Sequence, residues 1–448
     1  MITLRKVNNK KYIYTEFVLL ILLSISQFFG VTGANLGIVL CIICLFCLLP
    51  EKKDTEALFI AMPAFNMFSY SLGKTSLFYL LIILYSVKYL WHKNFRVNKR
   101  KMIIFFLCCL FTITIQDVEV WVKWVLQFWL MILLFNDKNL DQNFENIIKY
   151  TSVSAVLSSI VGYVMQINGK SIYTRSYVYI QDAGSTTRFA GLIGDSVFYG
   201  QFIAVLIAAN LTLAYRNKKY TMFAYIASAI MAAFVLLSFS KTAILLIAVE
   251  VTGYIVFLIA RNSNNRKNIF KNILLIFGVW AVIMLLYQYV MTHTDNILIK
   301  GFLTRFSAND LWTGRTSIAE TYFEWLSTDW KYWLSGMEYS QYTSGIQNGN
   351  LLITRAHNIY IETACLFGII PAIILLVALV CYFYRLQIKY RVSMMSYLPL
   401  LVLAASGISL HGHFEWHYYF LCSITFACVH SDIRKRKEIR SNEINAIY

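Results

Sequence analysis

Long runs of apolar residues alternate with short polar segments along nearly the whole chain. Most runs are about 15 to 25 residues long, close to the length that a helix needs to cross the hydrocarbon core of a membrane. Because the runs are continuous rather than alternating, they predict helices and not the strands of a barrel. We predict about fourteen spans (12–14), at residues 15–31, 34–50, 57–72, 75–91, 102–116, 118–136, 151–168, 192–215, 221–238, 242–260, 270–291, 358–384, 396–412 and 416–430.

Composition supports the same fold class. The 448 residues are 58% hydrophobic and only 14% charged, and the mean hydropathy is +0.58, which is too apolar for one soluble core. The first run lacks a small-residue cleavage site, so we interpret it as a retained helix rather than a signal peptide. The sequence predicts an all-α polytopic membrane protein in which residues 1–448 form a single integral membrane domain.

The distribution of lysine and arginine predicts the orientation of the helices. With the N-terminus in the cytoplasm, the inner segments hold most basic residues, while the outer ones are nearly free of them except in two loops, 169–190 and 292–356. These two loops do not contradict the orientation, because long loops are exempt from the positive-inside rule. Both termini are therefore predicted to be cytoplasmic. The net charge of +17 then mainly faces anionic lipid. Nucleic-acid binding is the lesser interpretation, because no basic stripe concentrates on one soluble element.

Inside the large outer loop 292–356, residues 314–335 predict an amphipathic helix. Thr313 offers a cap, apolar residues recur at helical spacing, and Gly336 supplies a stop. Its tryptophan and tyrosine side chains suit a helix that lies at the membrane interface. Aromatic faces also suit sugar rings, so both interpretations stay open.

Unusual polar residues gather on the predicted outer side, in segments that only a helix bundle could bring together. They are Arg175 and Arg188 in the first loop, Lys241 at a tight turn, Arg305, Arg315 and Arg355 in the large loop, His357 and Asn358 at the start of a span, and His411, His413, Glu415 and His417 in the last turn. A single cation at a helix end usually reaches to the lipid headgroups. A cluster on the side that the positive-inside rule disfavours indicates a functional site instead.

Metal and cofactor sites are not indicated. His411, His413 and Glu415 could ligate a metal, but the alternation points the two histidines to different sides of a helix, which favours interfacial hydrogen bonding. The chain has no Asp-x-Asp pair, glycine-rich phosphate loop or zinc-peptidase motif, so we predict no metal and no cofactor. Glu250, near the middle of span 242–260, is costly in lipid and is either a paired structural residue or a functional one.

The residue types at the outer side suit one chemistry. A helix N-terminus disfavours an imidazolium, so His357 should stay neutral and able to accept a proton as a general base. Arginine side chains bind phosphate oxygens in pairs and stay charged. A neutral base with several arginines at headgroup depth suits a substrate that carries a lipid-linked phosphate or diphosphate.

Four segments within residues 185–385 resemble the O-antigen ligase/polymerase superfamily, which contains the Wzy-type polymerases and the WaaL-type ligases. The segments are "TRFAGLIGDSVFYGQF", "LLSFSKTAILL", "TGRTSIAETYFEWL" followed by "WLSGMEY", and "RAHNIYIETACLFGIIP". Members of that family typically show an Arg-x-x-Gly segment, a Ser-Arg/Lys-Thr turn, a Gly-Arg before a loop helix, and a His-Asn before a glycine-rich span.

The resemblance implies that His357 is the catalytic base and that Arg188 and Arg315 bind the diphosphate. Lys241 stands where the family commonly has arginine, which replaces a forked contact by a point charge. We add Arg355 to this diphosphate-binding set. The further candidates are Arg175, Arg305, Asn358, His411, His413 and Glu415.

The implied reaction is a metal-independent, inverting glycosyl transfer at the outer face of the cytoplasmic membrane. A glycan on undecaprenyl diphosphate is the donor, and a sugar hydroxyl of a second lipid-linked repeat unit is the acceptor, in the synthesis of a capsule, an exopolysaccharide or O-antigen. A flippase and a chain-length regulator are the expected protein partners. Ligase-type transfer to another acceptor, a lipid-linked polysaccharide transporter and a lipid-binding or sensory membrane protein remain as alternatives.

Overall fold

The computed structural model describes residues 11–71, 76–93, 98–111, 118–170, 177–180, 184–261, 277–278, 281, 288–289, 292, 296, 299–300, 303–304, 315–338, 342, 356–410, 412–413 and 415–445. Its helices are α1 (Lys11–Phe28), α2 (Thr32–Leu48), α3 (Glu51–Ala61), α4 (Phe78–His92), α5 (Lys99–Phe111), α6 (Val118–Asn136), α7 (Lys138–Gln142), α8 (Phe144–Ile167), α9 (Ser196–Arg216), α10 (Thr221–Leu237), α11 (Lys241–Arg261), α14 (Arg315–Ser327), α15 (Lys331–Ser335), α17 (Ile359–Phe367), α18 (Ile369–Tyr390), α19 (Leu398–Ser406) and α20 (Trp416–Asn445). Three segments are 3-10 helices, η1 (Met62–Ser71), η3 (Lys218–Tyr220) and η4 (Met394–Tyr397), and the strands are β1 (Tyr177–Ile180) and β2 (Gly184–Thr187).

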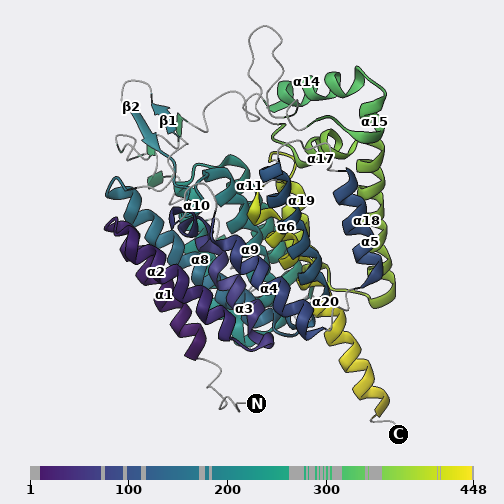
Figure 1. The fold of residues 1–448 in the computed structure, drawn as a ribbon, viewed down its shortest axis with the longest axis horizontal. Helices are drawn as coiled ribbons and strands as arrows, with labels where there is room; N and C mark the ends of the chain where they lie inside the picture. The colour runs from purple at the N-terminus through teal and green to yellow at the C-terminus, as the bar shows by residue number, and fades with distance from the viewer. Residues whose placement is uncertain are drawn as a thin grey trace.

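The long helices stand side by side in a bundle with two distinct ends (Figure 1). The strands β1 and β2 and the helices α14, α15 and α17 lie at one end, which we name the hairpin end. Helix α1 begins and α20 ends at the opposite end, which we name the tail end.

Seven helices in the described part of the chain are long and apolar enough to cross a membrane. They are α1, α6, α8, α9, residues Lys218–Leu237, residues Lys241–Ile259 of α11, and α18. Shorter apolar helices cover Thr32–Leu48, Phe78–His92 and Met394–Ser406. The predicted span 270–291 lies almost wholly outside the described residues.

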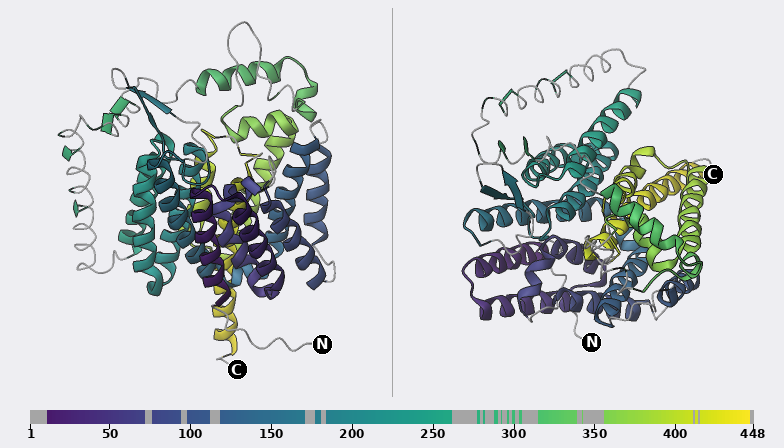
Figure 2. Two further views of the ribbon diagram at one scale, coloured as in Figure 1. Left: turned by 60° about the vertical axis from the view of Figure 1, so that its left-hand side comes forward. Right: turned by 90° about the horizontal axis from the view of Figure 1, so that it is seen from above.

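Several predicted spans differ from the helices in the structure. The prediction of one continuous helix over 358–384 is wrong: α17 ends at Phe367 and α18 begins at Ile369. Gly368 between them has φ +96°, which breaks the helical path, so α17 lies across the hairpin end while α18 runs along the bundle (Figure 2). Span 57–72 is the second part of α3 followed by the 3-10 helix η1, and span 396–412 begins in η4 and continues as the nine-residue α19.

The segments at the hairpin end also contain structure that the sequence did not predict. Residues Tyr177–Ile180 pair antiparallel with Gly184–Thr187, from Tyr177↔Thr187 to Ile180↔Gly184. The first strand reads Tyr-Val-Tyr-Ile, a composition that favours β structure. The helix predicted over 314–335 is two helices, α14 and α15, interrupted at residues 328–330.

Helix α9 forms the centre of the bundle. Of its apolar window, 94% is buried, and it packs against α8, α10, α11, α19 and α20. Small residues allow the close packing: a Cβ added at Gly200 would lie 2.5 Å from Cβ of Ala243 in α11. Polar side chains in the middle of α9 bond to its neighbours, as when Asn210 Nδ2 donates to Ser152 Oγ over 2.9 Å.

Helix α18 has the opposite environment. Among its 22 residues none is buried, although the helix is apolar on all sides, with side chains such as Ile374 and Val380 more than half exposed. It stands at the edge of the bundle (Figures 1 and 2). A helix of this kind is unfavourable in water and suits contact with lipid tails, which supports a membrane protein.

The corner at Gly368 generates a prediction about stability. Substitution Gly368→Ala combines an unfavourable φ of +96° with a Cβ only 2.7 Å from the carbonyl carbon of Leu334 in α15. We expect the free energy of unfolding to fall by about 1 to 3 kcal/mol, as is usual for such backbone strain. The measurement is thermal unfolding of the purified protein in detergent.

Gly253→Ala in α11 is the matched control, because nothing lies within 4 Å of an added Cβ there. Its unfolding midpoint should be unchanged or higher, since alanine favours helix more than glycine does. Equal midpoints for both variants would show that the corner between α17 and α18 does not depend on glycine.

Candidate functional site

Arg188 joins the loop before α9 to the turn between α10 and α11. Its Nε donates to the carbonyl oxygen of Ser238 over 2.9 Å, and its Nη2 donates to that of Phe239 over 3.5 Å. The backbone N–H of Phe189 donates to the carbonyl of Leu237 over 3.0 Å. Carbonyls at a helix C-terminus lack intrahelical donors and carry partial negative charge, so a guanidinium is favourable there. Arg188 is only 9% exposed, so its guanidinium positions this turn.

The turn that Arg188 holds presents Lys241. Phe239 has a φ of 49°, and Ser240 follows it with its backbone N–H donating to Ser238 Oγ over 3.3 Å. Lys241 is the first residue of α11 and is partly buried. A cation at a helix N-terminus is opposed by the macrodipole, so this position is costly for lysine unless an anion shares it.

The start of α11 contacts the segment that follows α19. Ser409 Oγ donates to Thr242 Oγ1 over 3.0 Å. One residue earlier, the carbonyl of Ile408 accepts from Asn358 Nδ2 over 3.0 Å, and the N–H of Ile359 donates to the carbonyl of Gly407 over 2.8 Å. The residues around Ser409 therefore link the Lys241 turn to the start of α17.

Asn358 caps α17 and fixes the residue before it. Its Oδ1 accepts from the N–H groups of Tyr360 and Ile361 over 2.9 and 3.1 Å, while its Nδ2 makes the bond to Ile408. His357 precedes this cap with a φ of 46°, in the left-handed region that residues other than glycine seldom adopt. Strained backbone of this kind persists only where neighbouring contacts enforce it, and it occurs often at functional sites.

Glu362, which lies one turn into α17, organises the last loop of the hairpin end. It is fully buried, and its Oε2 accepts from the N–H groups of Gly412 and His413 over 2.7 and 2.9 Å. Its Oε1 accepts from the hydroxyl of Tyr342 over 3.1 Å. Tyr322 in α14 donates to the carbonyl of Tyr342 over 3.0 Å, so this carboxylate connects α17, the loop before α20, and α14.

His413 is held inside the protein by both of its ring nitrogens. Nε2 lies 2.8 Å from Thr363 Oγ1, and Nδ1 lies 3.2 Å from the hydroxyl of Tyr419. Burial lowers the pKa of His413, while the nearby Glu362 raises it by a smaller amount. The ring is therefore neutral at physiological pH and serves as a hydrogen-bonding link between α17 and α20.

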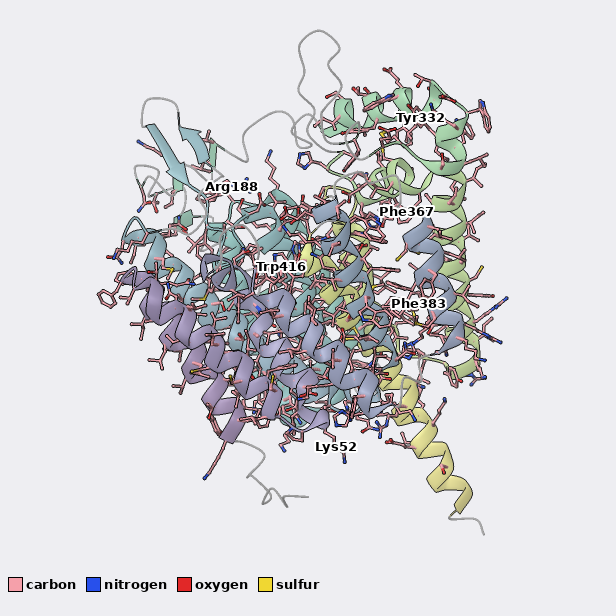
Figure 3. The ribbon with its side chains drawn as sticks, viewed as in Figure 1. Lys52, Arg188, Tyr332, Phe367, Phe383 and Trp416 are labelled. Atoms are coloured by element: carbon pink, nitrogen blue, oxygen red, sulfur yellow. The ribbon has the colours of Figure 1, made fainter. Side chains whose placement is uncertain are left out.

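The predicted site residues thus fall into two groups. The structure joins Arg188, Lys241, His357, Asn358 and His413 through a continuous series of contacts at the hairpin end. Figure 3 shows Arg188 at this end and Lys52 at the opposite one. The residues Arg175, Arg305, Arg355 and His411 lie outside the described residues, and for Arg315 only the backbone, at the start of α14, is described.

Other predicted residues have specific environments. Glu415 is partly buried, and its carbonyl accepts from the N–H of Tyr418 over 3.0 Å. Glu250 is 1% exposed, and neither of its carboxyl oxygens has a hydrogen-bond partner among the described residues. In the same part of the chain, no group of three or more His, Cys, Asp or Glu side chains is arranged to hold a metal ion.

Sequence reasoning missed Glu362 and Gln201, and it did not predict that His417 of the last turn pairs with Gln201 inside the bundle. Gln201 donates to Ser406 Oγ over 2.7 Å, and its Oε1 lies 3.3 Å from His417 Nε2. One signal could have identified Glu362, which is an ionisable residue within the apolar run 358–384. Comparisons with models of protein families, with curated proteins and with solved structures found no match.

The role of Glu362 is testable by its removal. Glu362→Ala leaves the buried N–H groups of Gly412 and His413 without their acceptor, so we expect the free energy of unfolding to fall by about 3 kcal/mol. The measurement is thermal unfolding in detergent. Glu324→Ala is the matched control, because Glu324 is an exposed glutamate on α14, and its midpoint should not change. A shift of the same size in both variants would contradict the proposed role.

Proposed function

We propose that the protein polymerises lipid-linked oligosaccharide repeat units by metal-independent, inverting glycosyl transfer. The donor is a glycan on undecaprenyl diphosphate, and the acceptor is a sugar hydroxyl of a second repeat unit. The proposal includes about fourteen membrane spans, cytoplasmic termini, and a site at the outer face of the cytoplasmic membrane. The resemblance to the O-antigen ligase/polymerase superfamily and the arrangement of the hairpin end support it.

One observation carries the proposal. Three separate sequence segments, containing Arg188, Lys241 and His357, are joined by hydrogen bonds at the end of the bundle that is opposite to the tail. These are the segments in which the family resemblance puts its arginines and its base. A histidine held in a left-handed conformation between cap and loop is consistent with a residue kept in place for chemistry.

The reaction follows from the roles of these residues. The imidazole of His357 accepts the proton of the acceptor hydroxyl as that oxygen attacks the anomeric carbon of the donor. The new glycosidic bond forms on the face opposite the leaving group, the bond to the diphosphate oxygen breaks, and undecaprenyl diphosphate departs with the electron pair. Lys241 and Arg315 stabilise the charge that develops on the diphosphate, while Arg188 positions the Lys241 turn.

Ligase-type transfer uses the same chemistry with a different acceptor. A transporter of lipid-linked polysaccharide is a second candidate, and Glu250 favours it, because a buried carboxyl group within a membrane span is frequent in transport proteins. The two classes differ in their dependence on His357, which only a glycosyl transferase needs.

The variant His357→Ala tests the catalytic role. Loss of a general base should reduce the rate at least about 100-fold, so that glycan no longer extends beyond one repeat unit. The measurement is polymer length on gels from cells that carry only the variant, with its membrane level checked by immunoblot.

His92→Ala is the control, because His92 is an exposed histidine at the tail-end terminus of α4. It should leave polymer length unchanged. Normal polymer in His357→Ala cells would exclude His357 as the base. Loss of lipid-linked repeat units from the outer leaflet, rather than loss of polymerisation, would favour the transporter.

The predicted topology is tested by reporters of location. A phosphatase that is active only outside the cytoplasm, inserted between α14 and α15 at residue 329, should be active. The same reporter fused after residue 445, at the end of α20, should be inactive. The reverse pattern would put His357 on the cytoplasmic side and contradict the proposed site.

A further inference from the structure

A polar pocket of about 190 Å³ opens at the tail end, away from the site described above. Five elements line it: α7, the first turn of α8, the last residue of α9, Tyr220 of η3, and the distal part of α20. Its charged lining residues are Arg216, Arg434, Lys435, Asp141, Glu145 and Glu438.

Arg216 supplies a positive charge that no carboxylate neutralises by a hydrogen bond in the described part of the chain. Its Nη1 donates to Ser431 Oγ over 2.7 Å, and its Nη2 donates to Ser396 Oγ and to the carbonyl of Cys428 over 2.5 Å each. The Nε atom is buried and has no hydrogen-bond partner among the described residues. These hydrogen-bond acceptors are neutral, and the carboxylates of Asp432 and Glu145 act on the guanidinium only through longer-range electrostatic attraction.

The two cations on α20 have acidic partners instead. Lys435 Nζ lies 2.6 Å from Glu145, and Arg434 Nε lies 2.7 Å from Glu438. Both basic side chains are close to half exposed, so these pairs are weak and can rearrange. The lining therefore contains two exchangeable ion pairs and the additional charge of Arg216.

The start of α8 adds partial positive charge. Asn143, Phe144, Glu145 and Asn146 line the pocket, and they form the N-terminus of a 24-residue helix. Asn143 makes no capping hydrogen bond with its side chain. Amide groups at such a terminus favour a bound anion, and here they occur together with the Arg216 guanidinium.

Asp141 is the remaining acidic group. Burial, followed by repulsion from Asp137, raises the pKa of Asp141 to about 7, against smaller opposite effects of Lys101 and Arg434. The hydroxyl of Tyr382 in α18 is near enough to interact electrostatically with this carboxyl group. Asp141 is therefore about half protonated near neutral pH, and the pocket becomes more positive as the pH falls.

We propose that the tail-end pocket binds a phosphate group, carried either by the headgroup of an anionic phospholipid or by free inorganic phosphate. Arg434 and Lys435 supply cationic donors that suit phosphate oxygens, and Arg216 adds positive charge beside them. The proposal does not rest on the glycosyl transfer suggested for the hairpin end. It concerns the end that the sequence predicts to face anionic inner-leaflet lipid.

Binding to the purified full chain in detergent tests this proposal. The probes are phosphatidylglycerol, with phosphatidylcholine for comparison, measured by native mass spectrometry, and inorganic phosphate, measured by thermal shift. We expect the double variant Arg434→Gln, Lys435→Gln to weaken binding about tenfold or more, because charged hydrogen bonds to phosphate are lost.

The matched control is Arg436→Gln, Lys437→Gln, which removes the same two charges from neighbouring positions of α20 outside the pocket. The affinity of this control variant for both probes should stay within about twofold of that of the unmodified protein, because a twofold change is much smaller than the loss of one charged hydrogen bond. Equal weakening by both double variants would mean that the basic tail attracts anions in general, which would overturn the proposal. Absence of binding by both probes would also overturn it.

The two probes distinguish the two sources of phosphate. Tight retention of phosphatidylglycerol that excess inorganic phosphate displaces only weakly assigns the pocket to a lipid headgroup. Stabilisation by inorganic phosphate without selective retention of phosphatidylglycerol assigns it to the free anion. Selective retention of phosphatidylcholine, which carries no net charge, would contradict an anion pocket.

A pH series on phosphatidylglycerol gives an independent readout, since this phosphodiester stays singly charged at neutral pH. Protonation of Asp141 removes a negative charge, so affinity should rise severalfold from about pH 8 to about pH 6. Asp141→Asn should bind with high affinity throughout and lose this dependence. An unchanged pH profile in Asp141→Asn would show that Asp141 does not face the bound anion.

Discussion

The near-complete burial of α9 is the constraint on which the rest of the structure depends. In a bundle whose outer surface is apolar, the polar side chains of a central helix must find partners inside. Gln201 of α9 bonds to Ser406 of α19 and contacts His417 of α20, while Gly200 lets α11 approach closely. These contacts set the positions of α11, α19 and α20 at the hairpin end. The candidate site is built on the ends of those three helices, of α10, which also packs against α9, and of α17, so its geometry follows largely from the packing of α9.

Hydrophobic periodicity predicted most helices because their length and apolarity are properties of each segment alone. Hydrophobic periodicity failed to predict helix boundaries where the backbone conformation of one residue, rather than hydropathy, changes the direction of the chain. The run from Asn358 to Tyr384 is continuously apolar apart from Glu362, and only the positive φ of Gly368 divides it. The 3-10 helix η1 is likewise apolar, so its hydropathy does not distinguish it from a span. The hairpin of β1 and β2 depends on pairing between strands, which a scan for spans does not consider.

Residue chemistry identified the candidates for the site, but not the partners that define their roles. Asn358 was predicted from its place beside His357, and the structure uses both ends of its amide to cap α17 and to bind Ile408. Arg188 was predicted from the Arg-x-x-Gly pattern, and its donors meet backbone carbonyls. Neither contact can be recognised from the amino-acid sequence, because the acceptors are backbone carbonyl groups, which every residue has. Glu362 was detectable in principle, since a carboxylate in an apolar run must be satisfied by specific donors.

The turn between α10 and α11 has a cation on each side, Arg188 and Lys241. The dipoles of the two helices act on these cations in opposite ways, so the two side chains have different functions. Arg188 lies at the C-terminus of α10, where carbonyl oxygens stabilise its charge, so that charge already serves the fold. Lys241 lies at the N-terminus of α11, where the macrodipole opposes a positive charge and favours an anion. A diphosphate bound at this turn would be attracted both by the N-terminus of α11 and by the lysine charge. Its negative charge would offset the repulsion between the lysine and the helix dipole. On this physical ground Lys241, rather than Arg188, is the better candidate for direct contact with the donor, and a single point charge suffices because the amides of α11 supply directional hydrogen bonds.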